Sequence, residues 1–135
     1  MELGICVYNK KKRTLTFGGA GLFLLYYQDN VQHVINGDKR SIGDDNHINI
    51  DFSETCLELN GTEKFYLFSD GYRDQLGGAK KSKRFSRAKF FELLNKIKNL
   101  PPFQQEYLLE MEHMNYKGKH EQTDDISLIG FELKL

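Results

Sequence analysis

The stretch FYLFSDGYRDQLGG, residues 65–78, sets a continuous aromatic and aliphatic run directly against an aspartate and a glycine. A continuous apolar run is typical of a strand that is covered on both faces, so Lys64–Ser69 is predicted to be a central strand. Two interpretations of Asp70-Gly71 follow. The pair either forms a turn, in which glycine adopts unusual angles and the aspartate caps the backbone, or presents the Asp70 carboxylate to a cation.

The whole chain has the size and composition of one globular domain or a part of one. Of its 135 residues, 39% are hydrophobic and 28% are charged, which argues against disorder. Its 19 basic and 19 acidic side chains balance, so charge does not favour a nucleic acid as partner. No apolar run approaches the roughly 20 residues that cross a bilayer, so no membrane contact by this domain is expected.

Cysteine usage bears on the compartment. Cys6 and Cys56 each lie in strand-like apolar sequence and are interpreted as buried, reduced thiols, with a disulfide between them as the alternative. Reduced thiols are typical of the cytoplasm. We therefore expect a cytoplasmic domain, including the case in which it is the cytosolic end of a larger, membrane-anchored protein.

Strands dominate the chain before residue 79, and helices follow. Apolar runs bounded by turn residues predict strands in the first part and one more strand at the end. The expected strands are Glu2–Tyr8, Thr14–Phe17, Leu22–Tyr27, Val31–Ile35, His47–Phe52, Thr55–Leu59, Lys64–Ser69 and Ile126–Leu133, with residues 36–46 as an irregular loop. Strands, then two helices, then a closing strand indicate an α+β fold with helices on a sheet face.

Two helices are predicted between the last two strands. The first begins after Ser86 as N-cap and ends at Leu100-Pro101-Pro102, because proline cannot continue a helix. The second ends at Gly118. On one face of the second helix lie Phe103, Tyr107, Met111 and Met114. Apolar stripes at this spacing are typical of a core-facing helix surface, so this face is expected to be buried.

Two acidic positions are notable because both lie at strand ends. Asp70 ends the Lys64–Ser69 strand, and Asp124-Asp125 opens the last strand. If these strands pair antiparallel, Asp70 and Asp124 converge at one rim of the sheet. Two carboxylates at such a short distance repel each other unless a cation lies between them. Hard ions such as Mg²⁺ or Mn²⁺ prefer carboxylate oxygens as ligands. The alternative is two unrelated turn carboxylates.

The segment GGAKKSKR, residues 77–84, is interpreted as a flexible basic loop. Its cations are Lys80, Lys81, Lys83 and Arg84. They form either a solvated loop or, if the loop flanks the carboxylate rim, a surface that attracts a phosphorylated partner. The four histidines share no ligand-like spacing and are interpreted as surface or structural side chains.

Longer motifs bring these observations together. FYLFSDGYRDQLGG, a Lys-rich loop, LPPFQQEYLLEME and NYKGKHEQTDDISLIGFEL follow one another, and ICVYNKKKRTLTFGGAGLFLLYY and INGDKRSIG precede them. In this order the motifs resemble the carboxy-terminal half of the stage II sporulation protein E-like phosphatases, which are metal-dependent PPM-type protein serine/threonine phosphatases. The resemblance covers essentially all 135 residues. It implies part of an αββα sandwich, in which helices flank two packed, mainly antiparallel sheets.

The resemblance also implies an activity and its site. The family holds two Mn²⁺ or Mg²⁺ ions at one edge of the sandwich, where a bridging water attacks phosphorus and the ions withdraw charge. By this likeness Asp70 and Asp124 are ligands of one ion, and Asp125 is a direct or water-mediated ligand. Gly71 and Asp74 shape the site. The implied substrate is phosphoserine or phosphothreonine on a regulatory protein of the anti-sigma-factor antagonist type.

One family motif has no counterpart in this sequence. The family's earlier Asp, which bridges both ions and precedes Gly-His-Gly, is absent, since Glu2 is the only acidic residue before Asp29 and no Gly-His-Gly occurs. We therefore expect residues 1–135 to be the carboxy-terminal portion of a single PPM-type phosphatase domain, without its amino-terminal strands and first metal-binding motif. An upstream sensor or regulatory domain is expected in the full protein. Such a portion binds one ion weakly or none, with poor or absent turnover.

A second class of function stays open. A phosphatase portion that lacks part of its dinuclear site can serve as a non-catalytic interaction module, pairing with itself or with a regulatory partner. Sheets without their amino-terminal strands expose edges and an apolar face. A homo-oligomer formed through these edges is therefore expected.

Overall fold

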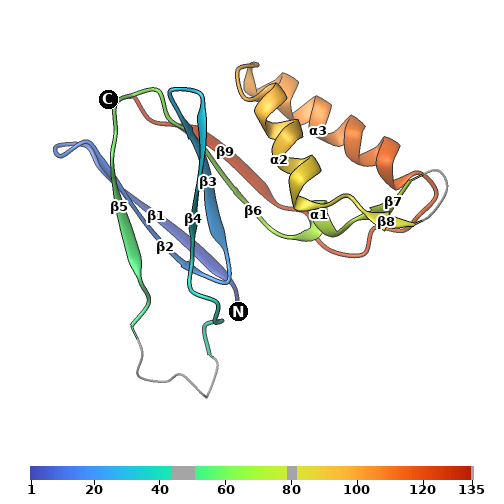
Figure 1. Ribbon diagram of the computed structural model, residues 1–135, viewed down its shortest axis with the longest axis horizontal. Helices are drawn as coiled ribbons and strands as arrows, with labels where there is room; N and C mark the ends of the chain where they lie inside the picture. The colour runs from blue at the N-terminus through green and yellow to red at the C-terminus, as the bar shows by residue number, and fades with distance from the viewer. Residues whose placement is uncertain (44–50, 79–81, 135) are drawn as a thin grey trace. The chain divides into compact units, whose positions relative to one another are not determined.

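The computed structural model describes residues 1–43, 51–78 and 82–134. They form two compact units (Figure 1). The sheet unit comprises Met1–Leu67 and the residues from Ile129 onward, and the helical unit comprises Phe68–Leu128. Strands and helices occur together, so the predicted α+β class is confirmed. No helix within the described ranges is long and apolar enough to cross a bilayer.

The sheet unit is built from two sheets. The first has the order β1-β2-β5, with β1 at Leu3–Asn9, β2 at Thr14–Ala20 and β5 at Glu54–Glu58. The second has the order β4-β3-β6-β9, with β3 at Phe23–Gln28, β4 at Val31–Asn36, β6 at Lys64–Phe68 and β9 at Leu128–Glu132. The pairs β1–β2, β2–β5, β3–β4 and β3–β6 are antiparallel.

Strand β6 is an inner strand, as its continuous apolar sequence predicts. It lies between β3 and β9. Near one end Lys64 Nζ lies 2.7 Å from Glu132 Oε1, and just past the other end the Ser69 N–H donates to the Ser127 carbonyl at 3.0 Å. Residue numbers therefore run in opposite directions along β6 and β9, which is the expected antiparallel arrangement.

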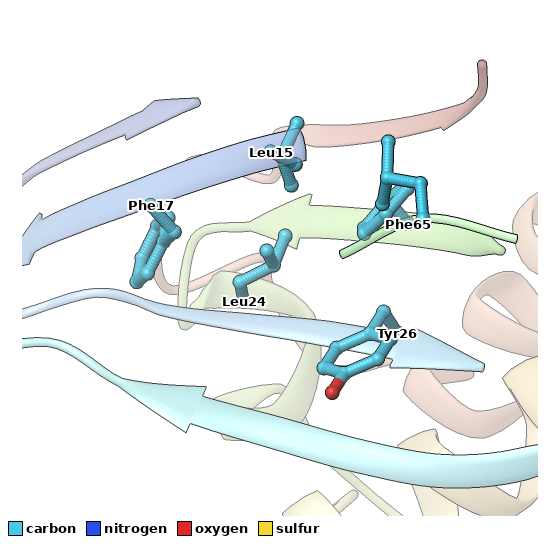
Figure 2. Close-up of a cluster of buried hydrophobic side chains, with 6 residues drawn as sticks. Leu15, Phe17, Leu24, Tyr26 and Phe65 are labelled. Carbon is cyan, nitrogen blue, oxygen red and sulfur yellow. The ribbon is translucent and has the colours of Figure 1, made fainter. Parts of the chain in front are cut away.

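The core of the sheet unit lies between its two sheets (Figure 2). Successive side chains of a strand face opposite sides, so alternate residues of β2 bury Leu15 and Phe17. The second sheet contributes Leu24, Tyr26 and Phe65. Phe65 stacks on Tyr26 with ring centroids 5.8 Å apart. Each fully buried side chain of this kind contributes roughly 1.5–3 kcal/mol, so this cluster holds β6 in place.

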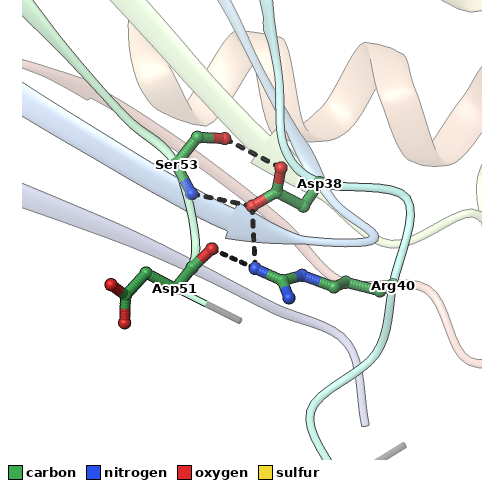
Figure 3. A network of polar contacts seen from close by, with 4 residues as sticks. All are labelled: Asp38, Arg40, Asp51 and Ser53. Atoms are coloured by element: carbon green, nitrogen blue, oxygen red, sulfur yellow. Dashed lines mark hydrogen bonds and ion pairs between the residues drawn. The ribbon is translucent and has the colours of Figure 1, made fainter. Parts of the chain in front are cut away.

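A polar network joins residues 38–40 to residues 51–53 in the same unit (Figure 3). The backbone N–H and the hydroxyl of Ser53 each donate to the Asp38 carboxylate at 2.8 Å. Arg40 donates to the Asp51 carbonyl and lies 3.8 Å from Asp38. The bonds from Ser53 lower the pKa of Asp38, because they stabilise its charged form. The network therefore fastens two loop segments to each other.

The described part of the helical unit contains three helices and a short hairpin. Helix α1 spans Gly71–Asp74, α2 spans Arg87–Ile97 and α3 spans Pro102–Lys117, while the hairpin pairs β7 (Leu76–Gly77) with β8 (Lys83–Arg84). Tyr72 of α1 stacks on Phe90 of α2 with ring centroids 4.6 Å apart. Its hydroxyl donates to the Leu109 carbonyl of α3 at 2.8 Å. One tyrosine thus connects the three helices.

Most predicted elements are present. Both long helices are confirmed, and α3 ends at Gly118 with a φ of 54°, an angle that favours glycine. Ser86 occupies the N-cap position of α2, but its side chain makes no capping hydrogen bond. The predicted strand His47–Phe52 lies mostly outside the described residues, and Asp51-Phe52 carries no strand. Helix α1 and the β7–β8 hairpin are absent from the prediction.

Two burial predictions are wrong. Cys6 and Cys56 are free thiols, but Cys56 is exposed and Cys6 is only half-buried. Among the described strands β5 ends its sheet and pairs with β2 alone, and most of its side chains, that of Cys56 included, are exposed. The face of α3 that carries Phe103 and Tyr107 is exposed, whereas Leu109 on the other face is buried. Helical spacing identifies an apolar face, but whether anything covers that face depends on the rest of the fold.

Candidate functional site

The end of β6 and the segment before β9 lie side by side. The Ser69 N–H donates to the Ser127 carbonyl at 3.0 Å, and the Ser69 hydroxyl donates to the Asp125 carbonyl at 2.9 Å. The Ser127 N–H donates in turn to the Ser69 hydroxyl oxygen at 3.0 Å. These bonds fix residue 69 against residues 125–127. Asp70 follows directly, so its backbone lies next to the backbone of Asp125.

Gly71 lets the two segments approach more closely than any side chain would allow. A Cβ atom at this position would lie 2.3 Å from the Asp125 carbonyl oxygen and 2.9 Å from the carbonyl carbon. Gly71 lies in α1 and is not among the glycines with positive φ. The interpretation in which this glycine supplies an unusual turn angle is therefore wrong, because what it supplies is space.

The Asp70 carboxylate does not cap the helix that follows it. An N-cap aspartate normally accepts a hydrogen bond from the second or third backbone N–H of its helix. Asp70 occupies the N-cap position of α1, yet its side chain makes no such bond. It is half-buried. The capping interpretation is therefore wrong for Asp70, and its interpretation as a cation ligand stays a prediction.

Asp124 and Asp125 are exposed and precede β9. The Asp125 N–H donates to Asp124 Oδ1 at 2.8 Å, and the Gln122 side-chain amide donates to the Asp124 carbonyl at 2.9 Å. Carboxylates on two adjacent segments are donors that suit a hard cation. Across the described residues, however, no group of three or more His, Cys, Asp or Glu side chains is arranged to hold a metal ion. The role of Asp70, Asp124 and Asp125 as metal ligands therefore stays a prediction.

Asp74 and Arg84, predicted to have separate roles, form an ion pair. Asp74 Oδ1 lies 3.5 Å from Arg84 Nη1, and both side chains are exposed to solvent, where such a pair contributes at most about 1 kcal/mol. Lys83 and Arg84 lie on β8, and the Tyr116 hydroxyl lies 3.0 Å from each of their carbonyl oxygens. This part of the predicted flexible loop is therefore an ordered strand. Lys80 and Lys81 lie outside the described residues.

Gln75 ties the acidic segment to the helices, and no sequence signal identifies it. This side chain is 1% exposed. Its amide nitrogen donates to the carbonyls of Leu76 and Glu121, both at 2.9 Å, and its oxygen lies 3.2 Å from His113 Nε2. Because that oxygen only accepts, the neutral ring carries its proton on Nε2. Burial lowers the pKa of His113, and Lys117 adds an effect of the same sign, so the neutral form is favoured.

Comparison with known proteins decides the family. The family model of stage II sporulation protein E (SpoIIE) matches residues 2–134. The chain belongs to the SpoIIE family. No curated protein matches the sequence significantly.

The solved structures that match this SpoIIE-family chain include phosphatase domains. The SiaA-PP2C domain of Pseudomonas aeruginosa matches at 27% identity and a TM-score of 0.84, over 97% of this chain and 51% of that chain. The Mn-presoaked phosphatase domain of the cell fate determinant SpoIIE from Bacillus subtilis matches at 11% identity and a TM-score of 0.69, over 98% of this chain and 56% of that chain. PppA, a key regulatory component of T6SS in Pseudomonas aeruginosa, matches at 17% identity and a TM-score of 0.60, over 90% of this chain and 54% of that chain. The chain has a PP2C-like fold and spans about half the length of these chains.

Proposed function

We propose that this chain is the carboxy-terminal portion of a metal-dependent protein phosphatase domain. Family membership and the likeness to PP2C-type domains support the class. The observation that carries the site is the backbone contact at Gly71, where a Cβ would meet the Asp125 carbonyl oxygen at 2.3 Å. This contact keeps the backbone of Asp70 beside that of Asp125, with Asp124 next in the chain.

Asp70, Asp124 and Asp125 are the proposed ligands of Mn²⁺ or Mg²⁺. Their carboxylate oxygens suit these hard ions, and one matching phosphatase domain was presoaked with Mn. A bound ion of this kind supplies an activated water and withdraws charge from a phosphoryl group. The residues around the carboxylates hold them in position, because the hydroxyl of Ser69 fastens one segment to the other.

The proposed substrate is phosphoserine or phosphothreonine on a regulatory protein of the anti-sigma-factor antagonist type. Lys83 is exposed on β8, and its neighbour Arg84 is held near α1 by Asp74. Basic side chains bind phosphate through charge-assisted hydrogen bonds. With Lys80 and Lys81 of the same segment, these residues are the proposed contacts of the phosphorylated partner.

The chain is proposed to contribute only part of the catalytic site. It spans about half of the matching phosphatase domains, and the described residues provide no group of three metal ligands. We expect one weakly bound ion or none, and poor or absent turnover, without the remaining ligands. An upstream sensor or regulatory domain and a cytoplasmic location belong to the same proposal, and the free thiols of Cys6 and Cys56 fit a reducing compartment.

A non-catalytic interaction module is the second candidate, favoured by an exposed apolar surface on the sheet unit. Ile5 and Val7 of β1 are exposed beside a hollow of about 240 Å³ that Phe52 also lines. In the part of the chain that the structure describes, β1 has β2 as its single neighbour in the sheet, and edge strands are templates for pairing with another chain. Pairing with a second copy or with a regulatory partner through this edge is the expected behaviour.

Calorimetric titration with Mn²⁺ tests the metal site. Wild type is expected to release heat that the double variant Asp70→Asn with Asp124→Asn loses, while Glu54→Gln with Glu58→Gln, which removes two exposed charges on β5, keeps it. Identical heats from wild type and the aspartate variant would reject the site. Metal-dependent hydrolysis of a phosphoserine peptide in Mn²⁺, lost in the aspartate variant, would then favour the phosphatase over the interaction module, which binds without turnover.

A further inference from the structure

Helix α3 presents an apolar stripe to solvent. The stripe consists of Phe103, Tyr107, Met111 and Met114, which are 68%, 60%, 39% and 62% exposed, and Leu108 beside it is 37% exposed. At 100° per residue, the four stripe residues fall within about 80° of one another around the helix. Contiguous exposed apolar surface of this kind is typical of an interaction site.

The opposite face of α3 already makes the contacts that hold the helix in its unit. Leu109 is 7% exposed and its carbonyl accepts the Tyr72 hydroxyl at 2.8 Å. His113 contacts Gln75, and the ring of Tyr116 packs edge-on against Phe85 with centroids 4.9 Å apart. The buried contacts of α3 thus come from its opposite face, and the apolar character of the largely exposed stripe needs another explanation.

Carboxylates border the stripe on one side and the adjoining Leu108 on the other. Glu106 and Glu110 lie on one flank, since Glu110 is four residues before Met114, and Glu112 lies on the other flank, four residues after Leu108. The three glutamates are exposed. An apolar stripe between acidic flanks complements a surface of apolar side chains between basic ones.

We propose that the α3 stripe binds an amphipathic helix of a partner protein, whose apolar face is flanked by lysine or arginine. Helix-in-groove recognition uses anchors at spacings of three and four residues, which Phe103, Tyr107, Met111 and Met114 provide. Two methionines adapt to irregular apolar surfaces. Pairing with a second α3 is disfavoured, because it sets glutamates against glutamates, and an anionic membrane is disfavoured by the same charges.

Two synthetic 18-residue helical peptides test this inference by fluorescence anisotropy at low salt. Both carry the same leucine stripe, and one has lysine and the other glutamate on both flanks. The lysine peptide is expected to bind at least about tenfold more tightly than the glutamate peptide, and to weaken as salt screens the charges. The readout is binding alone, so it is independent of metal or phosphatase activity.

Protein variants locate the binding. Tyr107→Ser with Met111→Ser is expected to weaken binding of the lysine peptide about tenfold. Val31→Ser with Ile129→Ser, at exposed apolar positions of β4 and β9, is expected to leave that binding unchanged. Glu106→Lys with Glu110→Lys is expected to reverse the peptide preference, and it serves as a second arm if the serine pair loses its helical signal.

Three outcomes overturn the inference. The first is no binding, or equal binding of both peptides. The second is binding of the lysine peptide that survives both the serine pair and the charge reversal. The third is a dimer of the peptide-free protein, seen by light scattering, that Tyr107→Ser dissociates, since this assigns the stripe to a second copy.

Discussion

Helices α2 and α3 belong to the same unit and carry apolar stripes of similar spacing, yet only one stripe is covered. In α2 the stripe of Phe90, Leu94 and Ile97 is buried, whereas in α3 Tyr107 and its neighbours face solvent. The cover of α2 comes from side chains distant in sequence, such as Tyr72 against Phe90. The spacing of apolar residues makes a helix amphipathic, while contacts with residues distant in sequence decide whether its apolar face is core or binding surface.

A substitution in the buried stripe of α2 is expected to give the largest effect on the free energy of unfolding. Phe90 is fully buried between Phe68 and Tyr72, with ring centroids 4.7 Å and 4.6 Å away. Phe90→Ala leaves a cavity there, and is expected to lower the free energy of unfolding by about 3–5 kcal/mol. Urea denaturation measures it. A loss below about 1 kcal/mol would show that α2 is no better covered than α3.

Gly71 tests the close approach at the candidate site. Gly71→Ala places a methyl group against the Asp125 carbonyl and is expected to cost about 1–3 kcal/mol. Gly18→Ala is the matched control, because the nearest atom to its Cβ would be 3.7 Å away, and its effect should stay within about 1 kcal/mol. If the control costs more than Gly71→Ala, the account of the close contact is wrong.

The burial of His113 on the packed face of α3 is expected to make the free energy of unfolding depend on pH. Burial keeps its pKa below the ordinary 6.5, so the unfolded chain takes up a proton at a higher pH than the folded chain. The free energy of unfolding is therefore expected to fall as pH drops below 6.5 and to level off below the folded-state pKa. Urea titrations across this range measure the slope. His113→Gln should reduce it, the exposed His120→Gln should not, and equal slopes in all three proteins would contradict this.

The open stripe is expected to give the smallest effect on stability. Tyr107 is exposed, so Tyr107→Ser should change the free energy of unfolding by no more than about 0.5 kcal/mol. The same urea measurement used for Phe90→Ala gives a direct comparison. A loss of more than about 2 kcal/mol in the free energy of unfolding would mean that the stripe packs as part of the core, and would contradict its assignment as a binding surface.

Much of the fold follows from the sequence because local periodicity records it. The inner position of β6, both long helices and the end of α3 at Gly118 are predicted from apolar runs and a single glycine. Helix α1 is missed because four residues are too few to show a helical period. The β7–β8 hairpin is missed because glycine and lysine there are typical of loops.

The candidate site was harder to anticipate. Pairing β6 with β9 brings the segments of Asp70 and Asp125 together, because the end of one strand lies beside the start of the other when adjacent strands are antiparallel. The reason for Gly71 is different from the one its sequence suggests, because a close contact with residue 125 leaves no local pattern. The role of Gln75 leaves no local pattern either, because its partners Glu121 and His113 lie far along the chain.

Paramagnetic broadening of amide NMR signals by Mn²⁺ tests the central claim most directly. If Asp70 and Asp124-Asp125 share one ion, substoichiometric Mn²⁺ should broaden residues 69–71 and 124–127 together and more strongly than the rest of the helical unit, and this broadening should be lost in Asp70→Asn. Broadening of one segment alone, or a pattern unchanged in Asp70→Asn, would contradict a shared site.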